Sequence, residues 1–80
     1  MGFSAKEAAN LRARSELMIQ MREIIRRNGW TQAAAAKRCG VSQPRINDLL
    51  RGKIDKFSLD ALFNMTASLG LKVHLELKVA

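Results

Sequence analysis

The apolar residues of this chain follow a helical period over most of its length and an alternating period at its end. Over residues 5–28, large apolar side chains recur at spacings of three and four, which predicts one stripe on an amphipathic helix. The members of this stripe are Leu17, Met18, Met21, Ile24 and Ile25. Ser4 and Glu7 have the spacing of a capping box at its start, and Gly29 suits a left-handed cap at its end.

Two short helices are predicted in the middle of the chain. Thr31 suits the N-cap of an alanine-rich helix over residues 32–39. Gly40 then opens a tight turn, where it is expected to take a positive φ. Ser42 caps a second helix that runs to about Arg51. The pattern therefore predicts a helix-turn-helix unit over residues 31–52.

The last part of the chain changes its period. Residues 58–70 predict a supporting helix that begins after Ser58 and is closed by Gly70. Residues 71–79 alternate apolar and polar positions, as a one-face strand does. The apolar members are Leu71, Val73, Leu75, Leu77 and Val79. Nothing else in the chain predicts a strand, so we expect this one to pair antiparallel with its copy in a homodimer. The alternative is a strand lying against its own helices.

Length and charge narrow the class of protein. The 80 residues predict a single domain, 1–80, whose first part, 1–29, holds the N-terminal helix or helices. The formal net charge is +7, and residues 22–56 hold nine basic against three acidic residues, a net of +6. This concentration favours a polyanionic partner, whether DNA, RNA or an anionic lipid surface. Neither a membrane-spanning run nor a secretory signal is recognisable, so we expect a cytoplasmic, nucleoid-associated protein.

Catalytic chemistry is not expected. The single histidine, His74, lies on the polar side of the alternating segment, and the single cysteine, Cys39, has neither a base nor a zinc ligand at workable spacing. No phosphate loop or nucleophile motif is present. We therefore expect no enzyme, no cofactor, no metal and no small-molecule substrate.

The second helix of the unit carries side chains suited to reading base edges. Gln and Asn pair with adenine, and Arg pairs with guanine, in the major groove. The expected base contacts are Gln43, Pro44, Arg45, Asn47 and Asp48. For Asp48 an ion pair with Arg45 or Arg51 is an equal alternative to a cytosine contact. The expected phosphate contacts are Thr31, Gln32, Ser42, Arg51, Lys53 and Lys56.

The segment TQAAAAKRCGVSQPRINDLLRGK, followed by KFSLDALFNMTASLG, resembles the Xre/Cro-type helix-turn-helix family, and within it the HigA-like antitoxin branch. The resemblance implies an all-α, five-helix, lambda-repressor-like domain, here with a short C-terminal β-strand. It also implies that Gln32, Gln43, Pro44, Arg45 and Asn47 lie at the DNA, with Gln32 bracing Gln43.

The same resemblance implies a function and partners. The protein is expected to be a sequence-specific repressor that binds an inverted-repeat operator in double-stranded DNA. As an antitoxin it would autoregulate its operon and bind a RelE/HigB-like ribonuclease toxin through its first helix, around Leu11. The alternatives are a stand-alone phage-type or housekeeping regulator, and a toxin-neutralising interaction module with secondary DNA affinity. RNA binding has less support, because Trp30 and the three Phe are expected in the core.

Overall fold

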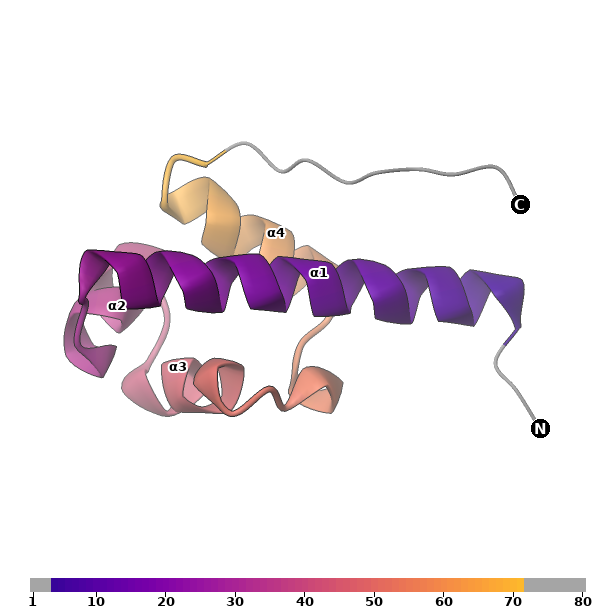
Figure 1. Ribbon diagram of the computed structural model, residues 1–80, viewed down its shortest axis with the longest axis horizontal. Helices are drawn as coiled ribbons and strands as arrows, with labels where there is room; N and C mark the ends of the chain where they lie inside the picture. The colour runs from indigo at the N-terminus through magenta and orange to yellow at the C-terminus, as the bar shows by residue number, and fades with distance from the viewer. Residues whose placement is uncertain (1–3, 72–80) are drawn as a thin grey trace.

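A computed structural model describes residues 4–71, and all regular structure in this part of the chain is helical (Figure 1). It contains four α-helices and one short 3-10 helix. In chain order they are α1 (Ala5–Asn28), α2 (Gln32–Cys39), α3 (Gln43–Leu50), η1 (Ile54–Lys56) and α4 (Leu59–Ser68). No helix within residues 4–71 is long and apolar enough to cross a membrane.

The first helix is a long rod, and the other elements pack against one half of it. Its 24 residues correspond to about 36 Å at 1.5 Å per residue. The predicted capping box is confirmed, since Ser4 and Glu7 exchange side-chain to backbone hydrogen bonds. Gly29 closes the helix at φ 63°, as predicted. The N-terminal end of α1 extends beyond the rest of the described fold (Figure 1).

The core lies where the C-terminal half of α1 meets α2, α3 and α4. All four helices contribute side chains to it, and Phe57 contributes one from the connection before α4. The buried apolar residues are Leu17, Met18, Met21, Ile25, Ala35, Ala36, Cys39, Ile46, Leu49, Phe57, Leu62 and Met65. The predicted stripe on α1 is confirmed except at Ile24, which is half-buried. A single core of this size is expected for a domain of 80 residues.

The geometry between α2 and α3 agrees with the predicted turn. Gly40 takes φ 72°, in the left-handed region that a side chain makes costly. The next residue, Val41, donates its N–H to the carbonyl of Ala36 at 3.0 Å, which folds the chain back on the end of α2. Ala36 is only 5% exposed, so its small side chain lets the neighbouring helices approach closely.

Two predictions about the fold, a fifth α-helix and a C-terminal strand, are not confirmed within residues 4–71. Residues 4–71 hold four α-helices, so the fifth α-helix implied by the family resemblance is not found in this part of the chain. Between α3 and α4 the chain forms only the three-residue η1, because Gly52 at φ 70° ends α3 and the next helix starts at Leu59. The predicted strand has only its first residue, Leu71, within the described residues; 72–79 lie outside them.

Candidate nucleic-acid interface

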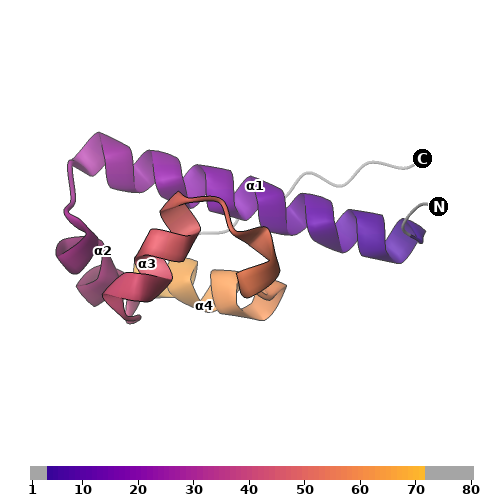
Figure 2. The same ribbon diagram turned by 90° about the horizontal axis from the view of Figure 1, so that it is seen from below.

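The second helix of the motif lies on the outer side of the molecule. In Figure 1, α3 and η1 occupy the lower edge, on the opposite side of the fold from α4. In Figure 2, which views the molecule from below, α3 crosses the centre, with α2 on one side and η1 on the other. Its inner side holds the buried Ile46 and Leu49. Its outer side is therefore available to a ligand as large as a duplex.

The proposed base-contacting residues differ in exposure along α3. Gln43 and Pro44 are exposed in the first turn, at the end that a recognition helix commonly directs toward base edges. Asn47 and Asp48 lie one turn later and are half-buried. The amide of Gln43 is thus the most accessible polar group of the base-reading set, and Pro44 lies in the first turn, where its missing N–H costs no helical hydrogen bond.

The Arg45 side chain turns toward the connection between α3 and α4. Its guanidinium carbon lies 4.2 Å from the centroid of the Phe57 ring. Its Nη1 donates a hydrogen bond of 2.6 Å to the carbonyl of Lys56. Arg45 is half-buried as a result, whereas Gln43 beside it is exposed. A base contact by Arg45 would require the side chain to leave this site.

Asp48 forms a longer-range contact than the sequence had indicated. Its Oδ1 lies 3.8 Å from the Nζ of Lys53, past the end of α3. The alternative expectation of an ion pair with Arg45 or Arg51 is therefore wrong. The physical reason is the turn at Gly52, which brings the chain back so that Lys53 also donates its N–H to the Asp48 carbonyl at 3.0 Å.

The expected phosphate contacts gather at two helix starts and one connection. Thr31 and Ser42 cap α2 and α3, and their hydroxyls accept hydrogen bonds from the N–H groups of Ala34 and Arg45. Gln32 is exposed in the first turn of α2, next to free backbone N–H groups that favour an anion. The exposed cations after α3 are Arg51, Lys53 and Lys56.

Two residues that position this surface were missed in the sequence. Arg14, on α1, donates from Nη1 to the carbonyls of Ile54 at 3.2 Å and Phe57 at 3.4 Å. These bonds tie η1 to a helix 40 residues earlier in the chain, and no local pattern predicts such a pairing. Phe57 was expected in the core, where its side chain is 1% exposed, but its contact with the Arg45 guanidinium was not predicted.

Three further residues with aromatic, thiol or carboxylate groups have structural roles. Trp30 is half-buried against the core, and the guanidinium carbon of Arg38 lies 4.6 Å from its ring centroid. Burial raises the pKa of the Cys39 thiol, which keeps the group protonated and unreactive near neutral pH. The pKa of the Glu23 carboxylate is lowered, first by the hydrogen bond from Arg26 and then by Arg27.

The comparisons with known proteins agree with this geometry. A family model described as "Helix-turn-helix domain" matches residues 2–78. A solved structure named "Putative XRE Family Transcriptional Regulator" is 27% identical, with a TM-score of 0.79. The alignment covers 92% of this chain and 83% of that one. A search of curated proteins gave no match. Since the family model spans nearly all 80 residues, the chain belongs to the helix-turn-helix domain family.

Proposed function

We propose that the protein is a sequence-specific, DNA-binding transcriptional repressor of the Xre type. The observation that carries this proposal is the exposed polar start of α3, with Gln43 and Pro44 at its tip and cations beyond its other end. A helix of this kind enters the major groove with its N-terminal residues toward the bases. The likeness to a solved XRE-family regulator supports the same assignment.

The proposed readout gives the side chains of α3 four roles. Gln43 and Asn47 read adenine, each through a paired donor and acceptor on its amide. Pro44 contacts a thymine methyl, since it lacks an N–H to donate. Arg45 reads guanine once it leaves the Lys56 carbonyl, and Asp48 accepts from cytosine once it leaves Lys53. Specificity at these last two positions therefore includes the free energy of breaking an internal contact.

The proposed backbone contacts surround this helix. Thr31, Gln32 and Ser42 are at the starts of α2 and α3, while Arg51, Lys53 and Lys56 follow α3. If each half of a dimer neutralises about four phosphates, log K should fall against log salt with a slope of about −7. A slope near −2 would show that most of these side chains stay solvated.

We further propose a homodimer that binds an inverted-repeat operator. The proposed pairing segment is residues 71–79, whose apolar members are Leu71, Val73, Leu75, Leu77 and Val79. Leu71 is 38% exposed, which is unusual for a large apolar side chain in this fold. A two-fold axis would place two α3 helices in successive major grooves, about 34 Å apart.

An antitoxin role is the more specific form of this proposal. It rests on the resemblance to the HigA-like branch, whose members repress their own operon and bind a ribonuclease toxin. The half-buried Leu11 lies in the N-terminal half of α1, and a RelE/HigB-like toxin is proposed to bind there. Co-purification with the product of a neighbouring ribonuclease-like reading frame, and loss of it on Leu11→Asp, would support this form.

The decisive experiment is selection of binding sites from random duplex DNA at about 150 mM salt. The purified full chain is the selecting protein, and a Gln43→Ala, Asn47→Ala double variant is the matched control. We expect an inverted repeat with half-sites about one helical turn apart. The control should lose the preference for adenine at two positions of each half-site. No enriched sequence would contradict the repressor assignment and leave the interaction module as the function.

A further inference from the structure

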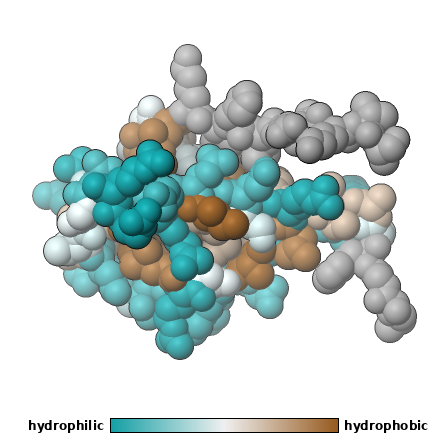
Figure 3. All heavy atoms as spheres, viewed as in Figure 1, coloured by the Kyte–Doolittle hydropathy of each residue, from teal (hydrophilic) through white to brown (hydrophobic). Residues whose placement is uncertain are grey.

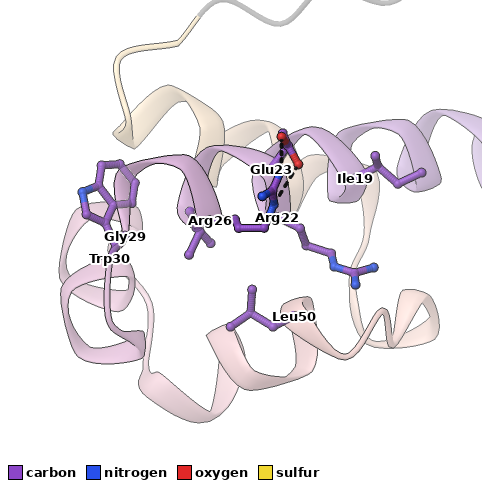
Figure 4. Close-up of a pocket in the computed structure, with 8 residues that line it drawn as sticks. Ile19, Arg22, Glu23, Arg26, Gly29, Trp30 and Leu50 are labelled. Carbon is purple, nitrogen blue, oxygen red and sulfur yellow. Dashed lines mark hydrogen bonds and ion pairs between the residues drawn. The ribbon is translucent and has the colours of Figure 1, made fainter.

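A groove opens between the C-terminal half of α1 and the C-terminal end of α3, with a volume of about 670 Å³ (Figure 4). Its apolar lining includes the buried Ile25 and the half-buried Trp30 and Leu50. Ile19 stands at one edge with 62% of its surface exposed, far more than any core side chain of α1. Figure 3 shows this face, where brown apolar spheres are surrounded by teal polar ones.

The rim of this groove carries positive charge. Its charged lining residues are Arg22, Glu23 and Arg26, a net of +1. The Glu23 carboxylate is shared by Arg26 and by Arg27, which does not line the groove, and these arginines lower its pKa, so Glu23 stays ionised. Arg22 forms no ion pair among residues 4–71. Its guanidinium extends toward the end of α3, 3.6 Å from where a Cβ on Gly52 would lie (Figure 4).

We propose that this groove, defined by Ile19, Arg22, Ile25, Arg26, Trp30 and Leu50, binds an acidic amphipathic helix of a partner protein. The apolar side chains of such a helix would cover Ile19 and Leu50 and remove them from water. Its carboxylates would pair with Arg22, and with Arg26 in exchange for part of its contact with Glu23, since planar guanidinium groups suit carboxylate ligands. An apolar base with a cationic rim matches this partner on both counts.

Charge and apolar contact favour an acidic helix over three other possible occupants of the groove: a second copy of the chain, its own residues 72–80, and a DNA backbone. A second copy of the chain would bring the same arginines against the groove. Residues 72–80 hold two lysines and one glutamate, so that segment is also cationic. A DNA backbone would satisfy Arg22 and Arg26 but would leave the exposed Ile19 and the half-buried Leu50 without an apolar partner. The acidic helix is therefore the occupant that the observations favour.

Occupancy would also affect α3. Leu50 belongs to both the groove and α3, so a bound helix would lie beside the surface proposed for DNA. The groove itself does not depend on that assignment: its binding of an acidic helix is measured without DNA. Failure of site selection and failure of peptide binding are thus separate results.

The chain contains its own reporter for the test, because Trp30 is the only tryptophan. The probe is a synthetic peptide of about 18 residues, or about five helical turns. Leucines recur in it at spacings of three and four, the other positions are Glu and Ala, and it contains no Trp. We expect a saturable change in Trp30 emission. A scrambled peptide of the same composition, and one with Lys in place of Glu, should give no saturation.

Variants on the exposed rim locate the binding. Ile19→Ser and Arg22→Ser should each lower the affinity for the peptide about tenfold, as truncation of a central contact does. Arg12→Ser is the matched control, since Arg12 is exposed on the same helix and does not line the groove; its affinity should equal that of the unchanged chain. Far-UV circular dichroism should be the same for all three, because none of the side chains is buried.

Several results would overturn the proposal. These are the absence of saturable binding, equal binding of the scrambled peptide, and unchanged affinity in both rim variants. A further contradicting result combines two measurements. In it, the peptide does not bind, and Ile19→Ser and Arg22→Ser bind random duplex DNA less tightly than Arg12→Ser does. That last result would assign the groove to the DNA surface instead.

Discussion

The guanidinium carbon of Arg45 lies 4.2 Å from the ring centroid of Phe57, and this contact joins α3 to the connection that leads into α4. The same side chain donates to the carbonyl of Lys56 at 2.6 Å. Phe57 is in turn anchored in the core with 1% exposure. The orientation of α3 on the domain is thus stabilised by Arg45, which we also predict to contact a base.

Arg45→Ala should lower the free energy of unfolding. The variant loses a cation–π contact and a charge-assisted hydrogen bond, together worth about 1–2 kcal/mol at a half-buried site. Urea unfolding followed by circular dichroism measures this change. Arg51→Ala is the control, because Arg51 is exposed, and it should stay within about 0.5 kcal/mol of the unchanged chain. Equal losses in both variants would show that the Arg45 contacts contribute nothing specific.

On DNA the same two substitutions should separate specificity from affinity. Arg45→Ala should weaken a selected operator by about 1–3 kcal/mol while random duplexes are bound nearly as before. Arg51→Ala should weaken both alike and reduce the magnitude of the salt slope by about 1 per site. Fluorescence anisotropy on matched duplexes distinguishes the two patterns. The same loss on operator and random DNA for both variants would contradict the assigned roles.

Arg14→Ala should destabilise the fold although Arg14 lies far from α3 in sequence. Its guanidinium is the side-chain donor to the carbonyls of Ile54 and Phe57, and removing it leaves part-buried acceptors without that partner. We expect a loss of about 1–3 kcal/mol in the free energy of unfolding. Arg12→Ala, two positions earlier and exposed, should be neutral. A neutral Arg14→Ala would mean that water replaces the guanidinium at no cost.

Cys39 should react slowly with thiol reagents in the folded protein. Its side chain is 2% exposed, and burial raises its pKa, so both access and thiolate content are low. At pH 8, labelling by a disulfide reagent should be much faster in denaturing urea than in buffer. Because the pKa of the Cys39 thiol is raised in the folded protein, the ratio of the labelling rate in urea to that in buffer should persist as the pH increases toward the ordinary thiol pKa. Rapid labelling of the native protein would show that α2 opens readily.

A chain that ends at Gly70 should be monomeric if residues 71–79 form the dimer. Light scattering compares its mass with that of the full chain over a range of concentrations. Leu75→Lys tests the same segment without truncation, since a lysine in the middle of the apolar row should prevent pairing. A truncated chain that remains dimeric would place the two-fold contact on the helices instead.

Local elements of this protein are determined by its sequence. Ser4, Thr31, Ser42 and Ser58 each cap a helix as their spacing predicts, because a cap bonds a backbone N–H three residues away. The apolar spacing on α1 likewise selects the side that faces the core. These contacts lie within one or two turns of helix, so a linear pattern contains them.

Only the tertiary structure decided how the proposed DNA surface is held. Arg14 meets η1 across 40 residues, and Arg45 meets the Lys56 carbonyl across 11. Asp48 pairs with Lys53 rather than with Arg45 or Arg51, which are nearer to it in sequence, because the turn at Gly52 brings the chain back. The groove between α1 and α3 exists for the same reason. Its residues, Ile19 and Leu50 among them, become neighbours only when the helices pack on a shared core.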